Sequence, residues 1–121
     1  MAREVNPIFI IEDDEIMAEC IEHACAPASV QIFSNAIEAM AAIAKNTTPR
    51  LIFLDVLLDG PDGFTFLNEL VSYQDTSQIP VVIVSSLDLA EKNLAEYGVV
   101  GVLDKSTMKP QEIKKYVAEY L

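Results

Sequence analysis

The sequence has 121 residues, 51% of them hydrophobic, so it is long enough to bury a core and too apolar to be intrinsically disordered. Its 19 acidic residues outnumber 8 basic ones and give a net charge of −11, which argues against binding to nucleic acid or to an anionic membrane surface. The chain has no secretory signal and no apolar run long enough to span a bilayer, so we expect a cytoplasmic protein.

Runs of apolar residues alternate with segments of helical periodicity along the whole chain. The predicted strands cover residues 7–11, 30–33, 51–54, 79–84 and 99–103, and the predicted helices cover 15–26, 36–45, 64–73, 89–97 and 110–121. Strand–helix alternation predicts an α/β fold, because right-handed crossovers between parallel strands place helices on both faces of the sheet. We therefore expect a doubly wound, five-stranded parallel sheet of the flavodoxin-like order 2-1-3-4-5. We expect residues 1–121 to form one domain, with no output domain.

Local signals set the ends and positions of several elements. Ser34 or Asn35 is the expected cap of the second helix, and Gly98 suits the end of the fourth. The strand 30–33 is short and alternating, which is typical of a strand near the edge of a sheet. Cys20 and Cys25 fit neither a redox motif nor a zinc pattern, so we expect ordinary half-buried thiols.

The third predicted strand organises the chain. Residues 51–54 are apolar at every position, which is typical of a central parallel strand covered on both faces. An ionised Asp55 would be costly inside such a strand, so we expect it at the strand's carboxyl end, where open α/β sheets bind their ligands.

Polar or charged residues follow three other predicted strands. They are Glu12 and Asp13 after the first, Ser85 after the fourth and Lys105 after the fifth. Because the carboxyl ends of parallel strands share one edge, we expect these groups to meet Asp55 in one crevice. Converging carboxylates repel unless one is protonated or a cation lies among them, and oxygen ligands without His or Cys favour Mg²⁺. The set suits a phosphoryl acceptor in which Asp55 is the nucleophile, Mg²⁺ and Lys105 neutralise charge, and Ser85 donates a hydrogen bond.

The motifs resemble those of the receiver domains of two-component response regulators. The matching segments, in chain order, are Ile11-Glu12-Asp13-Asp14, Phe53-Leu54-Asp55, Asp62-Gly63, Pro80-Val81-Val82-Ile83-Val84-Ser85 and Lys105. Each is weak alone, but all five in order at the expected strand ends are specific, and the resemblance covers nearly the whole chain.

The resemblance implies roles for individual residues. A histidine kinase or a histidine phosphotransfer domain would phosphorylate Asp55, with Asp13 and Asp55 as direct ligands of Mg²⁺. Glu12 would act mostly through water, and the backbone carbonyl of Leu57 would be a further ligand. The resemblance also implies output by docking to a downstream protein, and it leaves room for a dimer that forms on phosphorylation.

Several positions depart from the family pattern. Val102 stands where the family usually carries an aromatic residue, Ser106 replaces the proline after the lysine and makes a trans peptide bond the expectation, and Asp59 replaces a common proline. These changes concern the readout rather than the phosphorylation chemistry. Leu57 and Leu87 offer no hydrogen bond to a hydrolytic water, so we expect slow self-dephosphorylation.

Two other classes of function compete with this interpretation. A pseudo-receiver that never accepts phosphate is favoured slightly by Val102 and Ser106 and disfavoured by the complete acid set with Ser85 and Lys105. A phosphatase with an aspartyl-phosphate intermediate usually carries a second Asp two residues after its nucleophile, where this chain has Leu57. We therefore expect a signalling domain and not an enzyme that turns over substrate.

Overall fold

The computed structural model describes residues 6–45, 48–55, 63–86 and 94–120. Five parallel strands form one sheet in the order β2-β1-β3-β4-β5, so the predicted fold class is confirmed. The strands are β1 (Ile8–Ile11), β2 (Val30–Phe33), β3 (Leu51–Leu54), β4 (Val81–Ser85) and β5 (Val99–Asp104). The helices are α1 (Glu15–Cys25), α2 (Ala36–Ala44), α3 (Gly63–Ser72) and α4 (Pro110–Glu119), and a 3₁₀ turn, η1 (Leu94–Tyr97), precedes β5.

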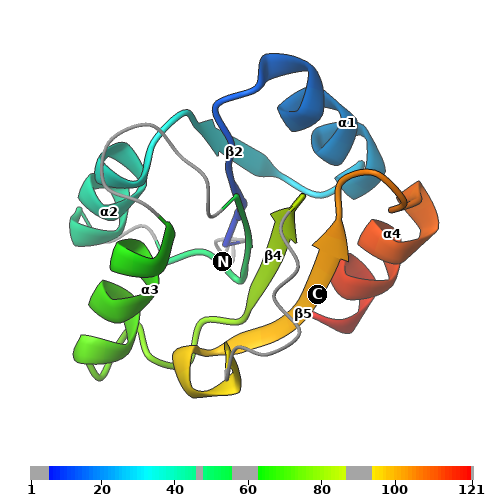
Figure 1. Cartoon of the computed structure of the whole chain (residues 1–121). Coiled ribbons are helices and arrows are strands. Elements are labelled where there is room, and N and C mark those ends of the chain that lie inside the picture. The colour runs from blue at the N-terminus through cyan, green and yellow to red at the C-terminus, as the bar shows by residue number, and fades with distance from the viewer. Residues whose placement is uncertain (1–5, 46–47, 56–62, 87–93, 121) are drawn as a thin grey trace.

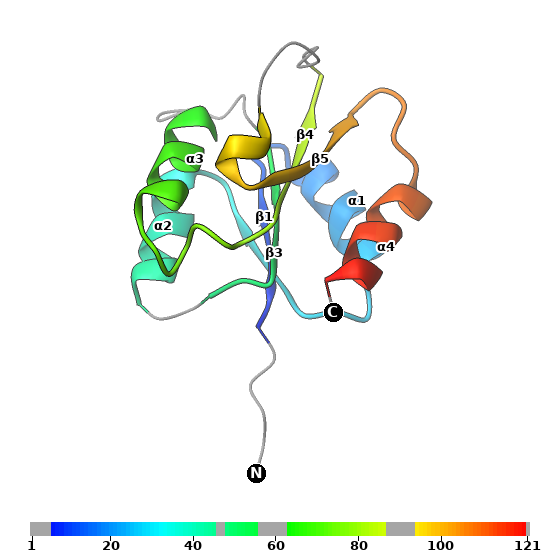
Figure 2. The same cartoon turned by 90° about the horizontal axis from the view of Figure 1, so that it is seen from below.

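The sheet forms the middle of three layers. Figure 1 and Figure 2 show α1 and α4 side by side on one face and α2 and α3 on the other. Each face has its own apolar core, one built around Ile21 of α1 and Ile113 of α4, the other around Ala39 of α2 and Leu67 of α3. Both cores are therefore anchored on the same sheet.

The three central strands are buried along their whole length. Every residue of β1, β3 and β4 is buried, which confirms the interpretation of 51–54 as a central strand covered on both faces. Burying each large aliphatic side chain contributes about 1.5–3 kcal/mol. Strand β2 lies at an edge as predicted, although Gln31 and Ile32 are both exposed and the expected alternation is incomplete.

Two predicted elements differ at their ends. Strand β4 begins at Val81 and not at Ile79, because Pro80 has no N–H for the ladder and contributes only its carbonyl, which accepts from the Ile52 N–H at 3.0 Å. The described end of the fourth predicted helix is the 3₁₀ turn η1 and not an α-helix; the N–H of Gly98 donates to the Ala95 carbonyl three residues earlier. Gly98 has a φ of 77°, which fits a chain reversal after this turn.

Side-chain caps fix where two helices begin. Asp14 accepts hydrogen bonds from the N–H groups of Ile16 and Met17, and Asn35 accepts from the N–H of Glu38 at 2.9 Å. The cap of α2 is thus Asn35, one of the two predicted residues. Of the helices in the described part of the chain, none combines the length and apolar character needed to cross a membrane.

The edge strand β5 packs closely against α4 at one point. A Cβ atom built on Gly101 would overlap the hydroxyl and ring of Tyr116, so the missing side chain of Gly101 makes room for this tyrosine. Tyr116 packs in turn against the core between α1, α4 and the sheet. Gly101 therefore fixes how closely α4 lies on β5.

Gly101→Ala is expected to lower the free energy of unfolding by about 1–3 kcal/mol, because the added methyl group must displace Tyr116. Urea denaturation followed by circular dichroism measures the loss. The matched control is the same substitution in a Tyr116→Ala background, where the space is open and the added cost should nearly vanish. An equal cost in both backgrounds would contradict the packing explanation.

Candidate functional site

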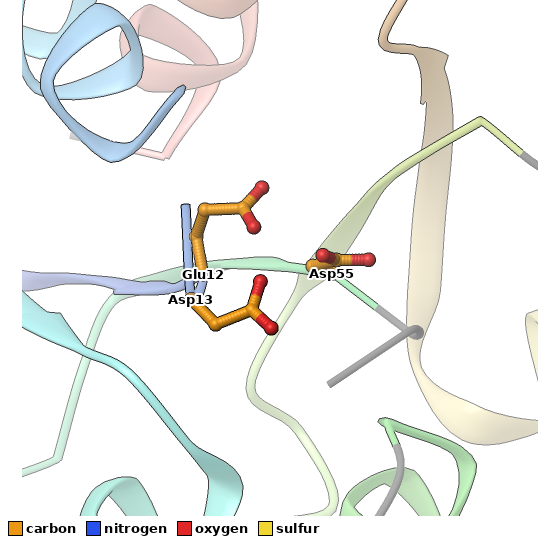
Figure 3. Close-up of side chains that lie close together, drawn as sticks. All are labelled: Glu12, Asp13 and Asp55. Atoms are coloured by element: carbon orange, nitrogen blue, oxygen red, sulfur yellow. The ribbon is translucent and has the colours of Figure 1, made fainter. Parts of the chain in front are cut away.

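Three carboxylates meet at the carboxyl edge of the sheet. Glu12 and Asp13 follow β1 directly and Asp55 follows β3, and these strands are neighbours. One oxygen of each carboxylate lies within 4.8 Å of one oxygen of the other two. Figure 3 shows the Glu12 and Asp13 side chains directed toward the side on which Asp55 lies. The convergence predicted from the strand ends is present.

Backbone hydrogen bonds hold two of these acids in place. The N–H of Asp55 donates to the Ile11 carbonyl at 2.9 Å, and the N–H of Glu12 donates to the Phe33 carbonyl at 2.9 Å. Both bonds extend the pairing of the sheet by one residue beyond its strands. Glu12 and Asp55 are each only 3% exposed, whereas Asp13 is exposed. The cluster therefore has a buried side and a side open to solvent.

Lys105 joins the two buried acids. Its ammonium Nζ lies 2.8 Å from Glu12 Oε1 and 3.0 Å from Asp55 Oδ2. Its own backbone N–H donates to the Ser85 carbonyl at 3.1 Å, which fixes the residue one position beyond β5. One cation thus balances two buried carboxylates, and Asp13 adds a third negative charge on the solvent side.

Burial shifts the protonation of this cluster. Loss of solvent raises the pKa of Glu12 from 4.5 to about 7, although the hydrogen bond from Lys105 opposes the shift, and nearby Asp55 adds to it. Burial alone would lower the pKa of Lys105, but its contacts with Glu12 and Asp55 prevail and raise it. A raised pKa of Glu12 lessens the repulsion within the cluster, but three carboxyl groups still face a single ammonium, the situation in which a hard cation binds oxygen ligands.

Ser85 and Leu57 are the remaining predicted site residues. Ser85 is the last residue of β4, next to β3 at the same edge, and is 1% exposed. Leu57 lies outside the described residues, as do Asp59 and Leu87. The structure thus brings Glu12, Asp13, Asp55 and Lys105 together and places Ser85 at the end of the adjacent strand.

Two departures from the family pattern are visible in β5 and the loop after it. Val102 is 44% exposed on β5. The only cis peptide bond in the described ranges joins Ala26 to Pro27, so the bond from Lys105 to Ser106 is trans as expected.

Asp104 organises the loop that carries Lys105, a role that the sequence analysis missed. Its Oδ1 accepts from both the backbone N–H and the hydroxyl of Ser106, at 2.8 and 2.7 Å. These hydrogen bonds lower the pKa of Asp104 below its usual range. An Asp followed two residues later by Ser is a turn signal that could have indicated this contact. Asp14, similarly, is part of the acidic run but serves as the cap of α1.

Comparison with known proteins agrees with this geometry. Residues 8–118 match the family model described as the response regulator receiver domain. The response regulator PleD of Caulobacter vibrioides is 34% identical over 83 residues, which cover 67% of this chain and 18% of PleD. The part of this chain that matches each of its curated relatives covers less than half of that relative's length.

Solved structures share the fold over nearly the whole chain. A putative response regulator from Chloroflexus aurantiacus superposes with a TM-score of 0.83 at 28% identity, covering 97% of this chain and 98% of that one. The phosphorylated cyanobacterial phytochrome response regulator RcpA gives a TM-score of 0.77 at 26% identity, covering 96% and 91%.

The raised pKa of Glu12 predicts a pH-dependent stability in the presence of a chelator. Below pH 4.5 Glu12 is protonated in both states and adds no pH dependence. Between pH 4.5 and about 7 only the folded state retains the proton, so the free energy of unfolding falls as the pH rises. Glu12→Gln should remove this slope and be more stable than the parent at pH 8 by about 1–3 kcal/mol.

Urea denaturation at several pH values with EDTA measures the effect. Glu15→Gln is the matched control, since it removes one charge from the same acidic run at an exposed position. If both variants have the same pH dependence as the parent, the buried Glu12 is not the cause.

Proposed function

This chain belongs to the family of response regulator receiver domains of two-component signalling, and from this membership we propose that Asp55 accepts a phosphoryl group in a Mg²⁺-dependent transfer. The donor is the phosphohistidine of a histidine kinase or of a histidine phosphotransfer domain. A carboxylate oxygen of Asp55 forms the new O–P bond, the N–P bond to the histidine breaks, and the electron pair returns to the imidazole. Residues 1–121 act as one receiver domain.

The observation that carries the proposal is the position of Asp55. It lies at the end of a fully buried strand, in contact with Lys105 and within 4.8 Å of the carboxylate oxygens of Glu12 and Asp13. A buried carboxylate held by a cation from another strand is preorganised for charge stabilisation during phosphoryl transfer. Lys105 already contacts Asp55, so its ammonium would need to move little to stabilise the negative charge that develops on the transferred phosphoryl group.

The acidic cluster fits a hard divalent cation. It offers oxygen ligands alone, and its negative charge exceeds what Lys105 balances. Asp13 and Asp55 would hold the ion directly and Glu12 mostly through water, with the Leu57 carbonyl as the ligand that the family resemblance adds. When bound, Mg²⁺ supplies neutralisation of the phosphoryl oxygens. Ser85, at the end of β4, donates a hydrogen bond from its hydroxyl group to a phosphoryl oxygen of the product.

Membership of this family implies exchange with histidine kinases or phosphotransfer proteins. The phosphorylated form would act by docking to a downstream protein, or as a dimer that forms on phosphorylation. Val102 is an aliphatic, part-exposed residue of β5, so the readout would not use an aromatic side chain at this position. The domain catalyses its own phosphorylation and slow dephosphorylation, without turnover of another substrate.

A pseudo-receiver that never accepts phosphate is the second candidate function. The observation that favours it is that two residues near the acidic site differ from the family pattern. Val102 replaces an aromatic residue, and Ser106 replaces a proline. The contacts of Lys105 with Asp55 and Glu12 count against it, because they retain the charge arrangement that transfer requires.

Incubation with Mg²⁺ and acetyl phosphate is expected to add one phosphoryl group, detected by intact mass, because Asp55 is preorganised as described. Asp55→Asn should abolish the adduct. Asp13→Asn should lose most of the Mg²⁺ dependence, whereas Glu15→Gln, an exposed acid two residues further on, should retain it. No adduct, together with no thermal stabilisation by Mg²⁺ and beryllofluoride, would favour the pseudo-receiver.

The phosphorylated chain is expected to lose its phosphoryl group slowly, since the leucines at 57 and 87 cannot orient a water by hydrogen bonding. The measurement is the decay of the phosphorylated mass after the phosphodonor is removed in the presence of Mg²⁺. Leu57→Asn and Leu87→Asn, which restore a polar side chain, should accelerate the decay, and Leu57→Met is the matched apolar control. Rapid loss from the parent chain would refute this prediction.

A further inference from the structure

A cavity, which we call the basal cavity, lies at the amino-terminal edge of the sheet, opposite the cluster of Glu12, Asp13 and Asp55. It has a volume of about 420 Å³ and is lined by residues 24–28, Arg50, Lys114, Val117 and Ala118. The walls come from the end of α1, the loop that follows it, the residue before β3 and the middle and carboxyl-terminal part of α4. Figure 2 shows α1 and α4 side by side on the face of the sheet where this cavity lies.

Two cations line the basal cavity, and neither forms an ion pair with an acid in the described part of the chain. The chain carries 19 acidic residues and 8 basic ones. Both ion pairs recorded within the described residues are made by Lys105, so neither Arg50 nor Lys114 has a carboxylate within 4 Å there. In so acidic a chain, two unpaired cations facing one cavity give this surface the charge that attracts an anion.

Only one of these two cations, Lys114, has a structural role that explains its position, which is to bind a carbonyl at the carboxyl end of α1. Lys114 Nζ donates to the Ala24 carbonyl at 3.3 Å, as expected of a cation near the negative end of a helix. Arg50 is different, because its Nε is enclosed and has no hydrogen-bond acceptor among the described residues. A buried charged donor that has no acceptor is destabilising, because its lost hydration is not replaced. An anionic oxygen that entered the cavity and drew the guanidinium toward it would supply an acceptor.

We propose that the basal cavity binds a small organic anion. Its carboxylate or phosphate-type group lies between Arg50 and Lys114, where charge-assisted hydrogen bonds are strongest. Its apolar part packs against the rest of the wall, which is formed by residues 24–28, Val117 and Ala118. The volume is within the range of small-molecule sites in proteins. This site is separate from the phosphoacceptor site and does not depend on it.

The test is a titration of the ¹⁵N-labelled chain, carrying Asp55→Asn and kept in EDTA so that the acidic site stays silent. Phenylphosphonate, hexanoate and inorganic phosphate are the probes. We expect saturable shifts of the backbone amides of 24–26, 28 and 114–118 with the two organic anions and weaker binding of inorganic phosphate. Comparing phenylphosphonate with hexanoate shows which anionic group the site prefers.

Variants separate the site from general charge effects. Arg50→Gln should weaken binding by about tenfold or more, which corresponds to about 1.4 kcal/mol. Lys115→Gln is the matched control, because it removes one charge at the exposed position next to Lys114 and should change the affinity by less than about twofold. Ala118→Phe should block the cavity while both cations remain.

Three outcomes would overturn the proposal. They are the absence of a saturable shift with either organic anion, an affinity that neither Arg50→Gln nor Ala118→Phe reduces, and equal binding of inorganic phosphate and phenylphosphonate.

Discussion

The contact of one ammonium with two buried carboxylates is the constraint on which the rest of this structure depends. Glu12 and Asp55 are both 3% exposed, a placement that is costly for two acids unless a cation lies between them. Lys105 provides that cation from the far side of β4, at 2.8 and 3.0 Å. The order β1-β3-β4-β5 and the register of β5 are therefore required by the site as well as by the core.

The sequence predicted the sheet well because its central strands are apolar at every position and its helices have regular spacing. Residues 51–54 fixed the middle of the sheet, and the strand-end residues fixed its functional edge. Helix geometry near 94–97 was predicted less well, since four residues with mixed polarity fit a 3₁₀ turn as readily as an α-helix. The start of β4 was misplaced because apolar character alone does not record the missing N–H of Pro80.

The positions of side chains at the acidic site were predictable where charge and strand end coincided. Asp55, Asp13, Glu12 and Lys105 met this condition. The pKa of Glu12 depends on how completely it is buried, and the contact of Asp104 with Ser106 depends on the path of one loop. Neither the depth of burial nor the path of a loop is encoded in residue spacing. The presence of Arg50 and Lys114 in one cavity could not be anticipated either, because it depends on how the start of β3 and the middle and carboxyl-terminal part of α4 lie relative to each other.

The two proposed ligand sites lie at opposite edges of one sheet, and they would interact only if some element had two arrangements that both ligands distinguish. Strand β3 connects the sites directly, with Arg50 before it and Asp55 after it, but it is fully buried and close-packed on both faces. Such a strand is a poor candidate for two arrangements, because any displacement would open cavities in both cores. Helix α1 is better placed. Its first turn is capped by Asp14, beside Asp13 of the acidic cluster, and its Ala24 carbonyl accepts a hydrogen bond from Lys114 in the basal cavity. A tilt or shift of α1 against α4 is thus favoured over a displacement of β3 as the route of coupling between the two proposed sites.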